Sequence, residues 1–269
     1  MSISPPSQAP RWDTHAHVFA GPVLPGSHYT PTDHSLAMWH AAVSPSGIDR
    51  VVLVQPSVYG ADNTIMLDAL RESGGVHRGV VVLDKDVSDR ALEKMHAAGV
   101  RGVRFNLVSP MGNDASSIDA ILARVHPLGW HVQFACKPVH VAWVHENQAR
   151  WRVPIVLDHL GGLRMDENSA ADFDALCALA DAGAWVKLSG YYRLGASAPF
   201  EAADPLIDKV HARFAGRALW GSDWPHTWHM ESQRGAAPAY ETLLAPLMRV
   251  FSEDVRQSIL CDAPAQLYK

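Results

Sequence analysis

Residues 12–17, Trp12-Asp13-Thr14-His15-Ala16-His17, form the first predicted strand and end it with two histidines. In a doubly wound sheet that binds a nucleotide, the first strand is normally followed by a phosphate-binding turn of the form Gly-x-Gly-x-x-Gly. No such turn follows His17, where the chain continues into a stretch rich in Pro, Gly and Ser over residues 18–36. A loop of that length is typical of a lid or a wall of a binding site. This strand end therefore argues against the doubly wound sheet.

The rest of the chain alternates between short apolar runs and helical patterns. Continuous β-branched runs such as Val51–Val54 and Ile155–Leu157 suit strands that are covered on both faces. Between them, residues 62–73 carry apolar residues at helical spacing. Eight strands are predicted, and they begin near Arg11, Arg50, Gly79, Arg101, Trp130, Val153, Trp185 and Ala218. This alternation predicts an α/β fold, a single-domain (β/α)8 TIM barrel over residues 11–269, after a flexible leader over residues 1–10.

Length and composition agree with a barrel and exclude several classes of protein. The chain has 269 residues, and such barrels commonly need about 250. Hydrophobic residues make up 48% and charged residues 19%, which is typical of a large core and not of disorder. The net charge is −5 and the Lys and Arg residues are scattered, so nucleic acid is not an expected partner.

The cellular location is predicted from what the sequence lacks. No apolar stretch approaches the roughly 18 residues that span a bilayer, so no membrane is expected as a partner. The first residues show no signal-peptide pattern. Cys136, Cys177 and Cys261 form no Cys-x-x-Cys pair, which favours a reducing, cytoplasmic location. The sequence leaves a homo-oligomer open.

Polar residues with catalytic potential stand where predicted strands end. In a (β/α)8 barrel the carboxyl ends of all strands converge on one cavity. The first strand ends with His15 and His17, the fourth with Arg104 and Asn106, the sixth with His159 and the eighth with Asp223. Strand eight closes next to strand one, so Asp223 should face the His15–His17 pair. Three imidazoles and a carboxylate in one pocket can hold a metal ion or stabilise charge on a carbonyl oxygen.

Several stretches of this chain match motifs of one known family in the same order. They are residues 12–19, 51–63, 102–107, 129–132, 154–162, 219–226 and 263–268. Together they resemble the amidohydrolase superfamily, and within it the lactonase branch that includes the 2-pyrone-4,6-dicarboxylate lactonases. A lone His-x-His would be a weak signal, but all of these stretches in order, over nearly the whole chain, make the resemblance strong.

The resemblance implies that the protein opens a lactone, a cyclic ester, with water. Asp223 would act as general base toward the attacking water and would then protonate the leaving alkoxide. His15, His17 and His159 would polarise the ring carbonyl, either directly or through a metal. The same four residues would be the ligands of one divalent metal, Zn or Mn, if one is bound. The dicarboxylate lactonases of this branch imply that no metal is required.

Departures from the family pattern restrict the expected substrate. Arg104 matches one of the arginines that clamp carboxylates in the dicarboxylate lactonases. Residues 107–110 have no second arginine, Gly161-Gly162 stands where another is expected, and Ala135 replaces a tyrosine. Because bidentate clamps are missing, we expect a different small lactone or carboxylate, less anionic or with a sugar-acid skeleton. The candidate substrate contacts are Arg104, Asn106, Ser57, Tyr59, Tyr191 and His226.

Other functions and other roles for nearby residues stay open at this point. A decarboxylase with one tightly bound metal and a lactone isomerase share the fold of the superfamily. A binding barrel without activity is disfavoured, since it has no need of all four polar groups. Asp13 and Asp158 precede the histidines of their strands and should point away from the cavity, and Lys137 should be solvated.

Overall fold

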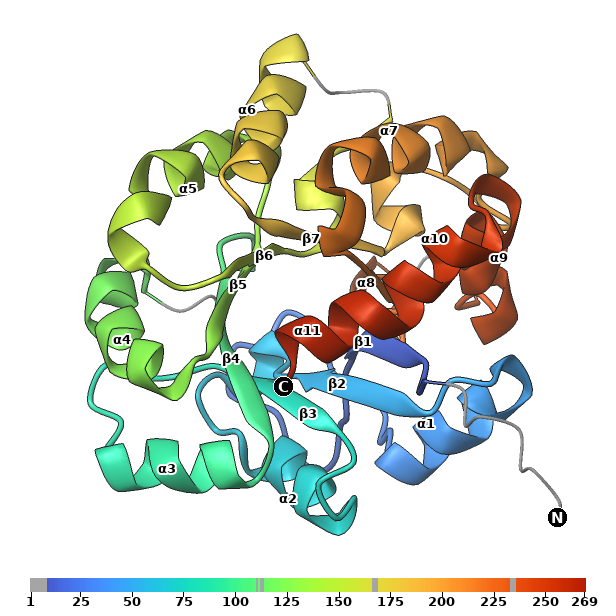
Figure 1. Cartoon of the computed structure of the whole chain (residues 1–269). Coiled ribbons are helices and arrows are strands. Elements are labelled where there is room, and N and C mark those ends of the chain that lie inside the picture. Colours follow the sequence, from blue (N-terminus) through green and yellow to red (C-terminus); the bar gives the residue numbers. More distant parts are fainter. Residues whose placement is uncertain (1–8, 110, 112–113, 166–168, 233–235) are drawn as a thin grey trace, which may run out of the picture.

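Parallel strands form the centre of the molecule, which a computed structural model describes over residues 9–109, 111, 114–165, 169–232 and 236–269. Each strand pairs with the next one along the chain. The strands are β1 (Trp12–Ala16), β2 (Arg50–Val54), β3 (Arg78–Val81), β4 (Val100–Asn106), β5 (His131–Ala135), β6 (Ile155–Leu157), β7 (Trp185–Ser189) and β8 (Ala218–Gly221). The Asp223 amide donates to His15 O and the His17 amide to Trp224 O, both at 2.8 Å, so the segment after β8 closes on β1. The predicted (β/α)8 barrel is confirmed (Figure 1).

Helices alternate with these strands and surround the barrel (Figure 1). They are α1 (Leu36–Val43), α2 (Thr64–Glu72), α3 (Asp89–Ala97), α4 (Ile118–Val125), α5 (Pro138–Trp151), α6 (Ala170–Asp181), α7 (Asp204–Phe214), α8 (Thr227–Ser232), α9 (Tyr240–Val250), α10 (Glu253–Gln257) and α11 (Ala263–Leu267). The helix predicted over residues 62–73 is α2, which buries Met66 and Leu70 against the barrel. Within the part of the chain that the structure describes, no helix has the length and apolar character needed to cross a bilayer.

The amino end of the barrel is closed by the last residues of the chain. One buried cluster contains side chains from several strands together with this terminal segment: Trp12, Val52, Val54, Val80, Val156, Trp185, Leu219, Ala263 and Tyr268. The ring of Tyr268 stacks on Trp12 with centroids 5.9 Å apart. Figure 1 shows α11 and the carboxyl terminus over the centre of the barrel. A substrate cavity therefore has to open at the opposite end, where the strands have their carboxyl ends.

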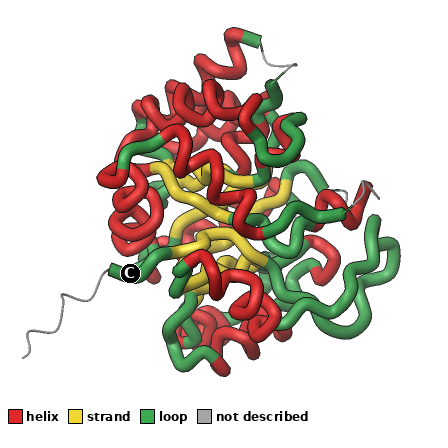
Figure 2. The backbone as a smooth tube through the Cα atoms, turned by 90° about the vertical axis from the view of Figure 1, so that its right-hand side faces the viewer, coloured by secondary structure: helices red, strands yellow, loops and turns green. Residues whose placement is uncertain are grey.

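The long loop after β1 is tied down at this carboxyl end. Phe19 and His34 exchange two backbone hydrogen bonds of 2.9 and 2.8 Å. The Tyr59 hydroxyl donates to Ala20 O at 3.0 Å and accepts from the Ala20 amide at 3.1 Å. Figure 2 shows long loops gathered at the end of the barrel away from the carboxyl terminus. Most of the predicted leader, residues 1–8, lies outside the described residues.

Candidate active site

A cavity of about 710 Å³ opens at the carboxyl ends of the strands. Its wall includes polar side chains that follow the strands, namely His17, Ser57, Arg104, Asn106, His159 and Arg193. The loop after β1 adds His28 and Tyr29, so the stretch predicted as a lid or wall lines the cavity. The volume lies within the range of pockets that bind small molecules.

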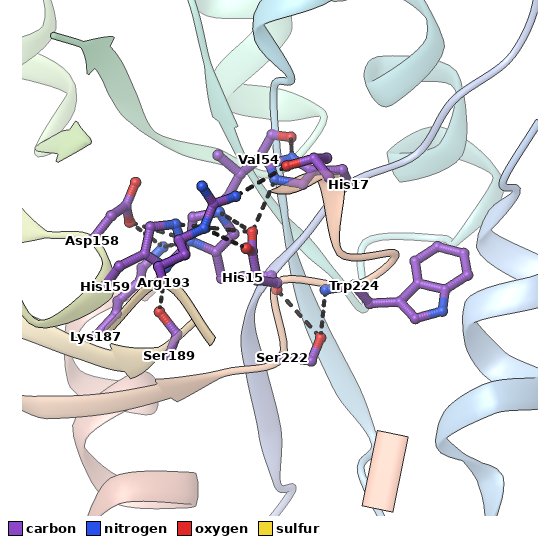
Figure 3. Close-up of polar contacts among 12 residues, drawn as sticks. His15, His17, Val54, Asp158, His159, Lys187, Ser189, Arg193, Ser222 and Trp224 are labelled. Carbon is purple, nitrogen blue, oxygen red and sulfur yellow. Dashed lines mark hydrogen bonds and ion pairs between the residues drawn. The ribbon is translucent and has the colours of Figure 1, made fainter. Parts of the chain in front are cut away.

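Three histidines converge on Asp223 directly behind this wall. Figure 3 shows these histidines, His15, His17 and His159, beside Arg193. Oδ1 of Asp223 lies 3.4 Å from His17 Nε2 and 3.5 Å from His15 Nε2. His159 Nε2 lies 3.9 Å from the same oxygen. All four residues are buried. The structure thus brings together the four residues that the sequence nominates as catalytic.

The close approach of β8 to β1 explains how Asp223 reaches the histidines. A Cβ atom on Gly221 would lie 2.6 Å from His15 Cβ, so a larger residue at this position would force the two segments apart. Asp223 itself has a φ of 59°, in the left-handed region that costs a non-glycine residue conformational energy. This turn directs the carboxylate toward the barrel axis, and the Asp223 amide bonds His15 O.

The polar neighbours of His15 in β1 and of His17 just after it indicate which ring nitrogen carries the proton. His17 Nδ1 lies 2.7 Å from Val54 O, and a carbonyl oxygen only accepts, so Nδ1 is the protonated nitrogen. His15 Nδ1 lies 3.2 Å from Asp158 Oδ1 and 3.5 Å from Lys187 Nζ, and the closer carboxylate favours a proton on Nδ1. In the neutral ring, each Nε2 therefore presents a lone pair to Asp223.

These lone pairs create a site that attracts positive charge. His15 Nε2 and Asp223 Oδ1 are buried and have no hydrogen-bond partner among the described residues. Acceptors that face each other across 3.4–3.5 Å are stabilised by a proton or a cation between them. His15, His17 and Asp223 offer one ligand atom each, all within 4.8 Å of one another. Two imidazoles and a carboxylate suit Zn²⁺ or Mn²⁺, so the residues fit one divalent ion.

The other carboxylate oxygen of Asp223 is held by residues that the sequence analysis did not nominate. Oδ2 accepts a hydrogen bond from the Tyr192 hydroxyl at 2.5 Å and from Arg193 Nε at 3.0 Å. Burial raises the pKa of the Asp223 carboxyl, but the charge of Arg193 outweighs burial and holds the pKa well below its usual range. The signal in the sequence is the Tyr-Tyr-Arg that follows strand seven at residues 191–193.

Asp158 was expected to point away from the site, but in the structure its side chain points into it. Its carboxylate lies beneath the histidines, 3.2 Å from His15 Nδ1 and 3.2 Å from Arg104 Nε. His159 and Leu160 have φ values of 49° and 52°, so the backbone leaves the strand geometry in which neighbouring side chains alternate. Consecutive residues 158 and 159 therefore both reach the barrel interior. Asp13 points away as expected, toward Ser222 and other buried donors.

A buried lysine completes the layer below His15. Lys187 on β7 donates to Gln133 Oε1 at 2.7 Å, and its Nζ lies 3.5 Å from Asp158 Oδ1. Gln133 Nε2 donates in turn to Asp158 Oδ2 at 3.0 Å. Burial lowers the pKa of Lys187 to about 8, opposed by the charge of Asp158. A lysine inside an otherwise apolar predicted strand is the sequence signal for this layer.

The candidate substrate contacts divide into two groups. Arg104, Asn106 and Ser57 line the cavity. Asn106 Oδ1 also accepts from the amides of Val108 and Ser109, so this side chain shapes the loop after β4.

The structure places the other three candidates away from the cavity wall. Tyr59 binds the Ala20 backbone and Tyr191 donates to Leu188 O in the core at 3.2 Å. The His226 ring packs edge-on against Tyr192 with centroids 5.9 Å apart. None of these three is among the residues that line the described cavity.

The cavity carries more positive charge than the sequence analysis anticipates. Lys137, Arg164 and Arg193 line it in addition to Arg104. Lys137 was expected to be solvated, and although it is exposed it stands on the cavity wall. Arg164 lies two residues after Gly162, close to the position where the family pattern has an arginine and this chain has none. The cavity therefore offers a substrate carboxylate more cationic side chains than the sequence predicts.

The comparisons with known proteins agree on one family for this chain. The model of the Amidohydrolase family matches residues 12–269. The chain is 32% identical to a 2-pyrone-4,6-dicarboxylate hydrolase of Comamonas testosteroni, covering 95% of this chain and 89% of the relative. It is also 32% identical to a 4-sulfomuconolactone hydrolase of Rhizobium radiobacter, covering 98% of this chain and 96% of the relative. A solved structure from Pseudomonas putida, assigned to the 2-pyrone-4,6-dicarboxylic acid hydrolases, superimposes with a TM-score of 0.82 at 31% identity and covers 97% of both chains.

Proposed function

The chain belongs to the amidohydrolase family, and we propose that it is a hydrolase that opens a small lactone bearing at least one carboxylate. One observation carries the proposal: the Nε2 atoms of His15, His17 and His159 lie within 3.9 Å of Asp223 Oδ1 behind a cavity lined by arginines. The two relatives described above are hydrolases whose names specify a pyrone dicarboxylate and a muconolactone. Both are anionic cyclic esters, which agrees with the charge of this cavity.

Asp223 is the proposed general base. Its low pKa keeps the carboxylate ionised at neutral pH, with Oδ1 directed toward the histidines. Water attacks the carbonyl carbon of the ring while Oδ1 accepts one of its protons. That proton then passes to the ring oxygen as the carbon–oxygen bond breaks, and the product is a hydroxy acid. A carboxylate of low pKa is a weak base, so this step needs strong polarisation of the carbonyl.

Positive charge near the carbonyl would come from the histidine cluster. A divalent metal bound by His15, His17 and Asp223, for which we propose Zn²⁺ or Mn²⁺, would supply that charge and acidify the attacking water. Burial lowers the pKa of His159 to about 4, so this imidazole is neutral at pH 7 and acts by donating or accepting a hydrogen bond. Arg104 and Arg193 are the proposed partners of the substrate carboxylate, because both line the cavity close to the cluster.

The proposed compartment is the cytoplasm. Support comes from the three cysteines, all of which are free in the structure although Cys136 and Cys261 are buried. Unpaired cysteines are typical of proteins that work in a reducing environment.

A panel of carboxylate-bearing γ- and δ-lactones tests the proposed function. The full chain would be assayed as purified, after dialysis against a chelator, and after addition of Zn²⁺ or Mn²⁺, each in oxygen-18 water. Hydrolysis is expected to place one labelled oxygen in the product carboxylate. A rearranged lactone without label would indicate an isomerase, and released carbon dioxide a decarboxylase. If no member is opened under any of the three conditions, the proposal is wrong.

A further inference from the structure

Four apolar side chains line the cavity on the side of the loops after β4, β5 and β6, where Lys137 and Arg164 also line it. Val108 follows β4, Pro138 and Val139 begin α5 after β5, and Leu163 follows the turn after β6. The polar groups of the cluster come mainly from β1 and β8, which lie across an eight-stranded barrel from β5 and β4. Val108, Pro138, Val139 and Leu163 are called the apolar region here, and they stand next to the charged Lys137 and Arg164 in the wall.

Two members of this apolar region are exposed to an unusual degree. Val139 is 71% exposed and Val108 is 48% exposed, and Val139 is the most exposed of the large hydrophobic side chains in the described part of the chain. Exposed apolar side chains that gather in a concave site mark a place where a ligand covers them. Both valines line the same cavity as His17 and His159, so one ligand can contact the valines and the histidines together.

The volume of the cavity points to the same conclusion. At about 710 Å³ it lies within the range of pockets that bury drug-sized ligands. A monocyclic lactone with a carboxylate is much smaller and would leave the apolar region filled with water. Ala135, at the end of β5, also lines the cavity and contributes only a methyl group.

We propose that the substrate carries an apolar substituent of several carbons that lies against Val108, Pro138, Val139 and Leu163. This inference rests on the proposed lactonase function and specifies its substrate class. The lactone ring lies near His17 and His159 with its carboxylate on the arginines, and the substituent extends outward from the ring. Apolar contact of this kind raises kcat/KM by about threefold to fourfold for each buried methylene group.

The test uses two matched series of ligands with the full chain. One series consists of carboxylate-bearing γ-lactones whose ring substituent is methyl, propyl or pentyl, and kcat/KM is measured for each. The other consists of the corresponding lactams, which resist hydrolysis, and their Kd is measured by calorimetry. For the parent protein, kcat/KM of the lactones is expected to rise and Kd of the lactams to fall by about threefold to fourfold per methylene, until the apolar region is filled.

Variants locate the effect on the protein. Val139→Asn replaces an apolar side chain of the region by a neutral polar one of similar size and is expected to flatten the chain-length dependence of Kd. Val76→Asn is the matched control, because Val76 is 46% exposed, precedes β3 at the other end of the barrel and does not line the cavity. The Val76→Asn variant should show the same dependence of Kd on chain length as the parent.

The lactam series separates this inference from the proposed function. Chain-length-dependent lactam binding without turnover of any lactone would support the apolar region and overturn the lactonase. Turnover with lactam affinities that do not change from methyl to pentyl would overturn the apolar region alone. An unchanged dependence in Val139→Asn would also overturn it.

Discussion

The two oxygens of the Asp223 carboxylate have different neighbours, and so they have different tasks. Oδ2 is held by Tyr192 and Arg193, which both follow β7. Oδ1 faces the imidazoles of β1 and has no hydrogen-bond partner among the described residues. A base that is fixed through one oxygen presents the other in a constant direction, which is what an oriented proton transfer requires. We therefore propose that Tyr192 is a positioning residue for Asp223, the proposed general base.

Removal of the Tyr192 hydroxyl tests this positioning. In Tyr192→Phe the carboxylate loses one of its two Oδ2 donors and is held by Arg193 alone. A hydrogen bond to a charged group contributes about 1.5 to 3 kcal/mol, so kcat should fall by roughly 10- to 100-fold. KM should change little, because the Tyr192 ring does not line the cavity. Steady-state kinetics on a lactone that the parent hydrolyses measures both constants.

The neighbouring tyrosine provides the control. Tyr191→Phe removes a hydroxyl that donates to Leu188 O within the core, away from Asp223. Its kcat should stay close to that of the parent. Equal losses of kcat in the two variants would show that the Tyr192 hydroxyl has no special relation to the base.

At the residue scale, the sequence identified the side chains that converge and missed those that support them. His15, His17, His159 and Asp223 were found because they stand at predicted strand ends. Tyr192 was missed in favour of Tyr191 because the direction of a side chain beyond a strand depends on the turn. Gly190 has a φ of 62° and begins such a turn, which no periodicity in the sequence reveals. The same cause led to the wrong expectation for Asp158.

At the scale of elements, β5, β6 and β7 together build the layer that supports His15. Gln133 from β5 and Lys187 from β7 both bind Asp158, which follows β6. Burial raises the pKa of the Asp158 carboxyl, but the neighbouring His15 and the charges of Lys187 and Arg104 outweigh burial and hold the pKa well below its usual range. An ionised Asp158 fixes the proton of His15 on Nδ1 and leaves Nε2 free for the cluster.

Loss of the buried lysine should weaken both the fold and the reaction. Lys187→Met leaves the Asp158 charge with fewer partners in a fully buried place. Breaking a buried ion pair from one side costs about 3 to 5 kcal/mol, and we expect the lower end because Arg104 remains. Urea denaturation measures the free energy of unfolding, and kcat should also fall. Lys94→Met, on the exposed face of α3, is the control, and a Lys187→Met protein as stable as this control would contradict the account.

Most elements could be predicted from the sequence because their patterns are local. Every predicted strand begins within two residues of the observed one, from Trp12 in β1 to Ala218 in β8. Continuous apolar runs indicate buried parallel strands whatever their neighbours are. Cationic residues such as Arg164 could not be placed in the same way, because they lie in loops whose path depends on the whole barrel mouth.

In the whole molecule, the two ends of the barrel differ: one end is a packed core and the other holds the cavity. The amino end is filled by the cluster around Tyr268, and the carboxyl end holds the cavity. His131 on β5 lies in the filled end, with its ring edge-on to Tyr268 at 5.3 Å between centroids. A Cβ atom on Gly102 would lie 2.3 Å from this ring, so the glycine makes room for it. Burial lowers the pKa of His131 to about 3.

This buried histidine should make the fold sensitive to acid. The unfolded chain binds a proton at His131 below about pH 6.5, whereas the folded chain stays neutral there until about pH 3. Its contribution to stability is therefore complete above pH 6.5 and is lost progressively as the pH falls toward 3. Between pH 7 and pH 5 the parent should lose about 2 kcal/mol more unfolding free energy than His131→Gln. Urea denaturation of both proteins at the two pH values measures the difference, and equal losses would refute the prediction.

We propose that Asp223 accepts the proton of the attacking water, and the variant Asp223→Asn removes that ability while it leaves the rest of the site in place. The amide keeps the size of the carboxylate but cannot serve as the base. With the best lactone of the panel, kcat/KM is expected to fall by roughly 100- to 10,000-fold, the usual contribution of general base catalysis, while circular dichroism shows an unchanged fold. A folded Asp223→Asn protein that opens the lactone as fast as the parent would contradict the claim.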